Sequence, residues 1–150
     1  MTKALFFDID GTLVSFQTHV IPASTIEALT LAHEKGIQIF IATGRPTLII
    51  NNLSELQSRG LIDGYITMNG GYCYVGDKII YKSSIPDKDV KCMADFCKKN
   101  GFPCIFVGEH DASVCQPNDL LRYIFYEHLG VKEFPEEDFE KATQREVYQL

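Results

Sequence analysis

The chain has 150 residues, of which 45% are hydrophobic and 23% are charged, and its formal net charge at pH 7 is −6. This composition is typical of a globular protein with one domain, or with one domain and a small insertion. The acidic balance gives no basic footprint for a phosphate backbone, so we expect no nucleic-acid partner. No apolar run approaches the roughly 20 residues of a membrane span, so we expect no membrane partner either.

The cysteines are odd in number and include no Cys-x-x-Cys pair; they are Cys73, Cys92, Cys97, Cys104 and Cys115. We therefore expect buried reduced thiols rather than a disulfide framework or a zinc site. Reduced thiols indicate a reducing compartment. The chain also reaches Asp8 too early to hold the apolar stretch of a signal peptide. Together these features predict a cytoplasmic protein.

The first half of the chain alternates between predicted strands and helices. A strand over 4–7 is followed by a helix that the capping box Ser24–Glu27 opens and Gly36 closes. A strand over 37–42, a helix from Pro46 to Gly60 and a strand over 64–68 come next. Residues 4–7 form a short, unbroken apolar run, which is typical of a parallel strand buried on both faces, and residues 37–42 read as a second buried strand. This alternation predicts an α/β fold with a parallel sheet.

The pattern changes after the third strand. A hairpin is predicted over 72–81, followed by a helix over 86–100 with the apolar stripe Val90, Met93, Ala94 and Cys97. Strands over 103–107 and 112–116 come next, and then a helix opened by Asn118 or Asp119. An acidic helical stretch over 135–142 and a strand-like segment over 146–150 end the chain. We interpret this half as a separate α+β unit. The predicted domains are residues 1–81 and 82–150.

Two carboxylates follow the first strand directly. Asp8 and Asp10 are two residues apart, so side-chain alternation directs both toward the crevice beyond the strand ends, where open α/β sheets bind ligands. Gly11 permits a sharp turn there, and Thr12 can fix that turn by a local hydrogen bond. An Asp-x-Asp-Gly surface turn is the alternative, but the apolar strand before it favours a functional site.

These motifs resemble those of a known family. Asp8-Ile9-Asp10-Gly11-Thr12 is similar to the first signature of the haloacid dehalogenase-like (HAD) phosphohydrolases. Ala42-Thr43-Gly44-Arg45 is similar to their second signature, in the form used by Cof-type sugar-phosphate phosphatases, and Met68-Asn69-Gly70-Gly71 fits the same subfamily. The resemblance implies a Rossmann-like parallel core with an inserted α+β cap of the C2 type.

The resemblance also implies a mechanism. Asp8 would attack the substrate phosphorus and form an aspartyl-phosphate, while Asp10 would act first as general acid and then as general base. A carboxylate at about 4 Å from a phosphate charge is repelled by roughly 4 kcal/mol per pair of unit charges, at an effective dielectric constant near 20. A Mg²⁺ ion held by Asp8 and by the backbone carbonyl of Asp10 would offset this repulsion.

The second and third strand ends offer candidate phosphate- or substrate-binding groups. Thr43 supplies a hydroxyl and Gly44 backbone N–H groups for phosphoryl oxygens, although Thr43-Gly44 alone would be a simple helix cap. Arg45 would clamp the phosphate or the sugar, or would be a solvated residue of the first helical turn. Asn69 would hydrogen-bond the substrate, or would only accommodate a strained turn.

Two further family signatures are absent from the sequence. One is a lysine downstream of the cap, and the other is an acidic strand end that completes the magnesium site. We therefore expect the chain to be an N-terminal part of a longer protein, with an incomplete core sheet and an exposed apolar edge beside the strand that ends at Asp8. Whether such a chain is active alone is left open.

The favoured function is a phosphatase of small phosphorylated metabolites, with sugar phosphates as the favoured class. A phosphomutase of the same superfamily is the alternative, because it shares the first signature. A catalytically incomplete phosphate-binding fragment is the remaining alternative.

Overall fold

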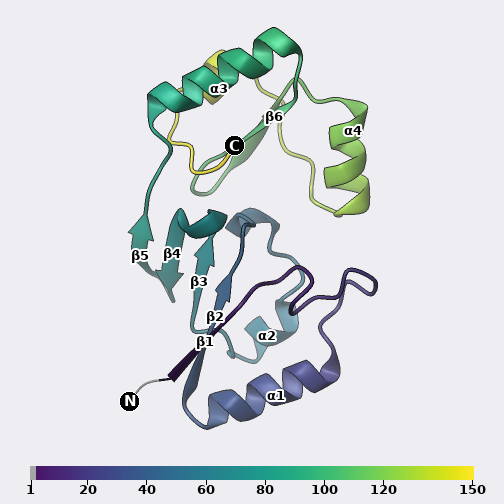
Figure 1. Ribbon diagram of the computed structural model, residues 1–150, viewed down its shortest axis with the longest axis vertical. Helices are drawn as coiled ribbons and strands as arrows, with labels where there is room; N and C mark the ends of the chain where they lie inside the picture. The colour runs from purple at the N-terminus through teal and green to yellow at the C-terminus, as the bar shows by residue number, and fades with distance from the viewer. Residues whose placement is uncertain (1–2) are drawn as a thin grey trace. The chain divides into compact units, whose positions relative to one another are not determined.

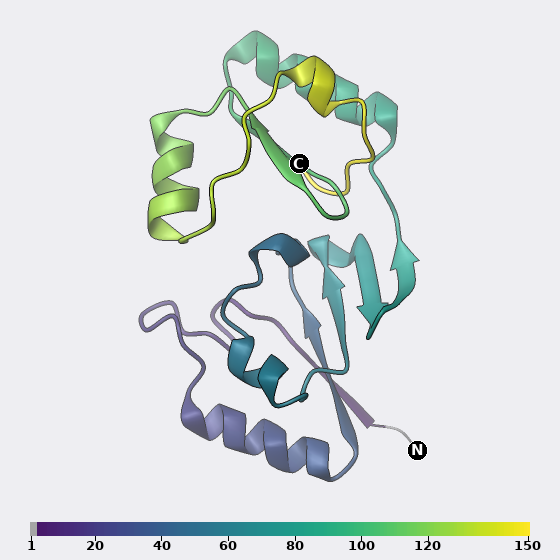
Figure 2. The same cartoon turned by 180° about the vertical axis from the view of Figure 1, so that it is seen from behind.

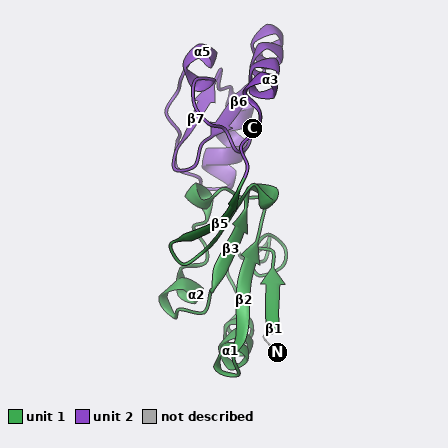
Figure 3. Ribbon diagram, turned by 90° about the vertical axis from the view of Figure 1, so that its left-hand side faces the viewer, with its two compact units in different colours: residues 1–82 green, residues 83–150 purple. Residues whose placement is uncertain are grey.

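The computed structural model describes residues 3–150 and divides into two compact units, residues 1–82 and residues 83–150 (Figure 3). Each unit has its own cluster of buried hydrophobic residues. No helix among the described residues is both long enough and apolar enough to cross a membrane.

The first unit is built on a five-stranded sheet with the order β1-β2-β3-β4-β5 (Figure 1). Its strands are β1 (Lys3–Phe7), β2 (Ile37–Ala42), β3 (Gly64–Thr67), β4 (Tyr72–Val75) and β5 (Lys78–Lys82). The first three strands pair in parallel, and β4 and β5 add an antiparallel hairpin. The predicted parallel strands and hairpin are confirmed, although β3 ends one residue earlier than expected.

Two helices cover one face of this sheet, namely α1 (Ala23–Glu34) and α2 (Ser54–Ser58), and α2 lies on the viewer's side in Figure 2. Because side chains alternate along β2, Ile39 and Ile41 point to this face. The buried cluster there consists of Ile9, Leu13, Val14, Ile26, Leu29, Ile39, Ile41, Leu53, Leu56 and Leu61. The residues that follow β1 are therefore anchored in the same core as the helices.

Strand β1 was expected to be buried on both faces, and this expectation is wrong, because Ala4, Leu5 and Phe6 are exposed and Phe7 is half-buried. Leu5 is 40% exposed and Phe6 is 57% exposed. Within residues 3–150, β1 pairs with β2 alone and forms the edge of the sheet. Phe6 stacks on Phe40 of β2, with ring centroids 5.0 Å apart, on the face opposite to α1 and α2. An exposed apolar edge is thus present, as the sequence led us to expect.

Helix α1 begins one residue before the predicted capping box. Pro22 occupies the N-cap position with φ −60°, and no side chain caps the helix. The backbone N–H groups of Thr25 and Ile26 donate to the Pro22 carbonyl, at 2.9 and 3.2 Å. Because the proline ring already fixes φ near this value, it starts the helix and leaves Ser24 inside the first turn.

The single helix predicted from Pro46 to Gly60 is wrong. The segment forms a 3₁₀ turn, η1 (Thr47–Ile49), and then the short α2, with an extended Ile50 between them. The carbonyl of Ile49 accepts a hydrogen bond from Nη1 of Arg45, at 3.1 Å, instead of serving a continuing helix. Residues 46–60 therefore form two short helical segments instead of one helix.

The second unit contains α3 (Asp87–Asn100), β6 (Cys104–Val107), β7 (Ala112–Cys115), α4 (Asp119–Leu121), the π-helical turn η3 (Arg122–His128) and α5 (Phe139–Ala142). The two predicted strands are confirmed as β6 and β7, which form an antiparallel pair. In the predicted stripe of α3, Val90, Ala94 and Cys97 are buried, but Met93 is 45% exposed.

Two C-terminal predictions for this unit need correction. Residues 146–150 form only an isolated bridge, between Gln149 and Val107, rather than a strand. The stretch 135–142 is helical only from Phe139, because Asp138 caps the helix there and accepts a hydrogen bond from the Lys141 N–H at 2.8 Å. The chain before the cap instead follows β7, with a bridge between Glu136 and Val114.

All five cysteines are free thiols, and Cys97, Cys104 and Cys115 are buried in the second unit as expected. The expectation fails for Cys92, which is exposed on α3, and Cys73 is half-buried. Burial raises the pKa of Cys104 to about 12, with further contributions from neighbouring Cys97. Burial also raises the pKa of Cys115 to about 11. These two thiols are packing groups rather than nucleophiles.

Candidate active site

The site begins where β1 ends. Ile9 is completely buried in the core, whereas Asp8 is exposed and Asp10 is partly exposed. The buried isoleucine between them pins the backbone to the core, and both carboxylates are left outside it. The predicted placement of two acids at the carboxyl end of the first strand is therefore what the chain adopts.

A tight turn fixes the backbone after Asp10. The N–H of Gly11 donates to the carbonyl of Val14 and the N–H of Val14 donates to that of Ile9, both at 2.9 Å. Gly11 has φ +74°, a conformation that other residues rarely adopt. A Cβ at this position would lie only 2.5 Å from Cε2 of Phe16, so any larger residue would also force this exposed ring to move.

The carboxylate of Asp10 is bound by Arg45, which follows the end of β2. Nε of Arg45 donates to Oδ2 of Asp10 at 2.8 Å, and Nη2 donates to Oδ1 at 2.6 Å. The Arg45 side chain is only 17% exposed, and that of Asp10 is 36% exposed. The alternative of a solvated first-turn arginine is therefore wrong. This two-point ion pair ties the first strand end to the second.

The remaining guanidinium nitrogen of Arg45 is also engaged. Nη1 donates to the carbonyl of Ile49 at 3.1 Å and to Oδ1 of Asn51 at 3.4 Å. The second contact is long for a hydrogen bond and is accordingly weak. Asn51 was missed by sequence reasoning, because it lies where a helix was expected and carries no motif.

Thr43, at the end of β2, is buried, and its Oγ1 accepts the backbone N–H of Arg45 at 3.1 Å. An accepting hydroxyl keeps its own hydrogen free to donate. The predicted helix N-terminus after Gly44 is reduced to the single 3₁₀ turn η1, whose N-cap is Pro46. Helix-dipole assistance at this point is therefore smaller than expected, and Thr43 is a local turn cap rather than a helix cap.

The third strand end packs against the second. The N–H of Asn69 donates to the carbonyl of Thr43 at 3.3 Å, and the N–H of Met68 donates to that of Arg45 at 3.2 Å. Met68 and Asn69 both have positive φ, +51° and +55°. Two consecutive left-handed residues are unusual without glycine and mark a strained turn that its surroundings hold in place. The side chain of Asn69 is exposed next to Gly44.

The oxygen atoms near β1 are the kind that Mg²⁺ prefers. The exposed carboxylate of Asp8 and the carbonyl of Asp10, which accepts no backbone hydrogen bond within the described range, fit such an ion. The side chain of Asp10 does not, because both of its oxygens accept from Arg45. Across residues 3–150, no group of three or more His, Cys, Asp or Glu side chains is arranged to hold a metal.

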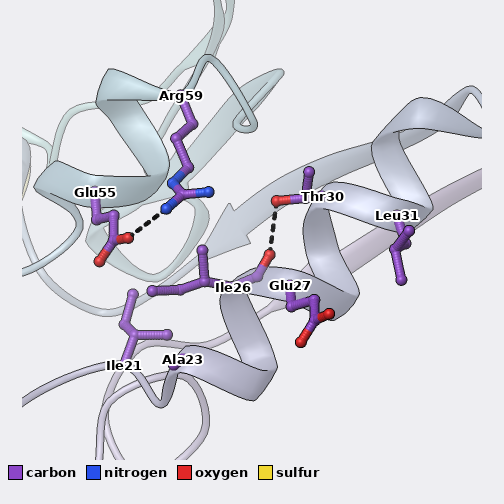
Figure 4. A pocket seen from close by; sticks show the side chains of 8 residues that line it. All are labelled: Ile21, Ala23, Ile26, Glu27, Thr30, Leu31, Glu55 and Arg59. Carbon is purple, nitrogen blue, oxygen red and sulfur yellow. Dashed lines mark hydrogen bonds and ion pairs between the residues drawn. The ribbon is translucent and has the colours of Figure 1, made fainter.

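Two hollows lie on the surface of the first unit. One, of about 300 Å³, is lined from α1 and α2 (Figure 4), and none of the candidate site residues borders it. An exposed pair there, Glu55 and Arg59 at 2.8 Å, and the Thr30 hydroxyl bonded to the Ile26 carbonyl are ordinary helix-surface contacts. The other, of about 360 Å³, is lined by residues 11–13 and 15–17 with Pro22, and adjoins the turn after Asp10.

Among curated proteins, YkrA of Bacillus subtilis (strain 168), a candidate phosphatase, is 27% identical over 158 residues, which cover 99% of this chain and 56% of YkrA. Pyridoxal phosphate phosphatase YbhA of Escherichia coli (strain K12) is 38% identical over 73 residues, or 49% of this chain and 26% of YbhA. This chain therefore spans only part of the length of these relatives.

Among solved structures, the HAD subclass IIB sugar phosphatase BT4131 superposes with a TM-score of 0.93 at 68% identity, over 97% of this chain and 56% of that one. The HAD-superfamily phosphatase BT1666 from Bacteroides thetaiotaomicron has a TM-score of 0.75 at 30% identity, over 98% of this chain and 54% of its own. The predicted HAD-like α/β fold is therefore confirmed.

A family model described as haloacid dehalogenase-like hydrolase matches residues 5–150. The match includes the ends of β1, β2 and β3, where the candidate residues lie. The chain belongs to the haloacid dehalogenase-like hydrolases.

Proposed function

We propose that this chain carries the nucleophile half of a phosphatase that hydrolyses small phosphorylated metabolites, with sugar phosphates as the substrate class. The observation that carries the proposal is the placement of Asp8. It is an exposed carboxylate at the carboxyl end of a parallel strand, with a second carboxylate two residues later and Thr43 at the end of the adjacent strand. The description of BT4131 as a sugar phosphatase supports the substrate class.

The reaction divides into two displacements. An Oδ of Asp8 forms a bond to the substrate phosphorus while the bond from phosphorus to the ester oxygen breaks, and Asp10 gives its proton to that leaving oxygen. Water then attacks the aspartyl-phosphate and gives a proton to Asp10. The bond between phosphorus and Asp8 breaks, which restores the carboxylate and releases phosphate.

Three further groups would bind the transferring phosphoryl group. The Thr43 hydroxyl has a hydrogen to donate, since its oxygen already accepts from the Arg45 N–H. Gly44 has no side chain, so a phosphoryl oxygen could come close to its backbone, and the exposed Asn69 side chain lies beside it. Arg45 contributes to the same site through its ion pair with Asp10.

Mg²⁺ is the cofactor that these oxygen donors fit, with the Asp8 carboxylate and the Asp10 carbonyl as its protein ligands here. When bound, the ion offsets the repulsion between a carboxylate and a phosphate dianion. We further propose that residues 83–150 are the C2-type cap. They form a compact unit with its own core and follow directly on the hairpin of β4 and β5. A cap of this kind excludes water and selects the substrate.

The test is phosphate release by the natural protein at its full length, with Mg²⁺ and a panel of hexose and pentose phosphates. Asp8→Asn should abolish release, and Asp10→Asn should lower it by about 10²- to 10⁴-fold. Asp77→Asn, in the exposed β4–β5 hairpin, is the matched control and should leave release unchanged. An isomerised sugar phosphate in place of free phosphate would identify a mutase, and binding without turnover would identify a binding module.

A further inference from the structure

We propose that Arg45 is a positioning residue for Asp10 rather than a clamp for the substrate, and that Ile49 and Asn51 hold Arg45 in place. This inference rests on the proposed function, because Arg45 would orient Asp10, the proposed general acid and base of the same site. Its basis is the set of hydrogen bonds that the guanidinium makes in the described chain.

Most of the N–H donors of Arg45 already make hydrogen bonds within the protein. A guanidinium has five N–H donors, and four of them are committed: two to the carboxylate of Asp10, one to the Ile49 carbonyl and one to Asn51. Only one N–H, on Nη2, remains for a phosphoryl oxygen while the pair is intact. A two-point grip on phosphate would require the pair with Asp10 to break.

The pair defines where Asp10 points. Two parallel N–H···O bonds fix both the position and the plane of the carboxylate, which a single-point contact does not. The Asp10 backbone is fixed independently, by the turn that Gly11 and Val14 close. With both ends held, the carboxylate has one orientation from which to exchange protons with the leaving oxygen and later with water. Positioning of this kind contributes to the rate, because small misplacements of a catalytic group are costly.

The support behind Arg45 explains a local irregularity of the fold. In a longer helix the Ile49 carbonyl would accept a backbone N–H, but here it accepts from Nη1 of Arg45, and the chain becomes extended at Ile50. The broken helix between η1 and α2 is thus the backbone arrangement that lets residues 49–51 reach the guanidinium. We assign this segment the task of holding Arg45 against Asp10.

A positioning role and a substrate-clamping role for Arg45 predict different pre-steady-state kinetics. With p-nitrophenyl phosphate, whose leaving group needs no proton, formation of the aspartyl-phosphate should survive the change Arg45→Ala, whereas its hydrolysis needs Asp10 as base. The full-length variant should therefore release a burst of p-nitrophenolate approaching one per site, followed by turnover about 10²-fold slower. KM should fall by a similar factor, because kcat/KM reports the formation step, which is unchanged. A rise in KM without a burst would overturn the proposal in favour of a substrate clamp.

A double-mutant cycle gives a second measurement. If Arg45 acts through Asp10, the variant Asp10→Asn with Arg45→Ala should be no slower than Asp10→Asn alone. If the rate losses of the two single variants multiplied in the double variant, the proposal would be contradicted. Arg45→Lys keeps the charge but offers only a single-point contact, and should recover part of the rate.

The role of Asn51 is tested by comparing its alanine variant with that of the adjacent Asn52. Asn51→Ala should slow turnover by about 2- to 10-fold, the range expected for one weak hydrogen bond. The control is Asn52→Ala, because the Oδ1 of Asn52 has no hydrogen-bond partner among the residues described. Equal effects of the two changes would overturn the role of Asn51. If the unaltered protein released no phosphate from any ester, the proposed function would fail first, which keeps the two failures distinct.

Discussion

Oδ1 of Asn69 lies 2.9 Å from the point where a Cβ on residue 44 would sit, so Gly44 and the Asn69 side chain occupy space that no larger residue at 44 could share. Because the contact is with the end of a flexible side chain, Gly44→Ala should change the free energy of unfolding by no more than about 1 kcal/mol. Its effect should instead be on activity, since the amide of Asn69 must rotate away.

We expect Gly44→Ala to lower phosphate release by about 10-fold, as for the loss of one hydrogen bond to substrate. Asn69→Ala should produce a similar loss, and the double variant should be no worse than either single variant. Rates on one sugar phosphate, together with urea unfolding of each variant, check both parts. Independent, multiplying losses would show that residue 44 does not act through Asn69.

The turn after Asp10 yields a prediction with an internal control. Gly11 and Gly36 both have φ +74°, but only Gly11 faces a side chain, that of Phe16. Alanine at either position should cost about 1–2 kcal/mol of stability from the left-handed backbone. Gly11→Ala should also lower activity, because it displaces the turn that carries Asp10, whereas Gly36→Ala should not. Thermal unfolding and phosphate release distinguish the two.

Adding Phe16→Ala to Gly11→Ala removes the steric contact and leaves only the backbone strain. Because the Phe16 ring is largely exposed, its own removal should cost little stability. If the double variant remained as inactive as Gly11→Ala, the backbone conformation rather than the ring contact would be the cause. If activity returned, the ring contact would be the cause.

The strand ends that carry the candidate site could be predicted because their signals are local. An apolar run ending in Asp8 or Thr43 indicates a buried strand and its carboxyl end without knowledge of the rest of the chain. The partner of Asp10 could not be found in this way, because Arg45 is 35 residues away and the sequence offers it two other plausible roles. The break in the helix predicted from Pro46 was missed as well. There Nη1 of Arg45 donates to the Ile49 carbonyl four residues later, and the chain is extended at Ile50.

Exposure was the other quantity that local pattern could not supply. The unbroken apolar run of β1 is that of a buried strand, yet Leu5 and Phe6 are exposed because β1 has one strand neighbour in the described chain. Met93 fits the helical spacing of the α3 stripe but lies at its margin, and is exposed as well. Burial depends on which elements pack against a residue, and hydrophobic periodicity reports only which face it lies on.

The thiols of the second unit should differ in reactivity. Burial raises the pKa of Cys104 to about 12 and that of Cys115 to about 11, above the ordinary value of 9.0. At pH 8 an alkylating reagent should therefore modify the exposed Cys92 in the folded protein and spare Cys104 and Cys115. Peptide mass spectrometry after timed alkylation measures this order. Alkylation of Cys104 at the rate of Cys92 would contradict it.

The same shifts predict a loss of stability at high pH. A thiol whose pKa is higher in the folded than in the unfolded state contributes stability that is fully present below about pH 9. This contribution is lost progressively as pH rises from about 9 toward 12, because the unfolded thiolate forms first. Urea midpoints at pH 7.5 and pH 10 test it, with Cys104→Ala as the variant whose midpoint should fall less between the two. An equal fall in variant and parent would remove Cys104 as a cause.

Arg145 should be the most stabilising charged residue of the second unit. Its guanidinium contacts the fully buried Ser113 hydroxyl, Oδ2 of Asp111 at 3.1 Å and Oε2 of Glu137 at 3.4 Å. Arg145→Leu leaves Ser113 buried without this partner and should destabilise the protein by about 1–3 kcal/mol. The control Arg59→Leu removes an exposed i,i+4 pair with Glu55 and should cost less than about 0.5 kcal/mol.

The cost of Arg145→Leu should also depend on pH. A hydrogen bond from Lys141, and then those from Ser113 and the charge of Arg145, lower the pKa of Glu137 below its ordinary 4.5. A carboxylate with a lowered folded pKa contributes stability that is present above its unfolded pKa and is lost as pH falls through the folded value. The difference in urea midpoint between parent and Arg145→Leu should therefore be largest near pH 7 and should shrink below pH 4.5. A constant difference across this range would mean that Arg145 acts through Ser113 and packing, without a contribution from the charge of Glu137.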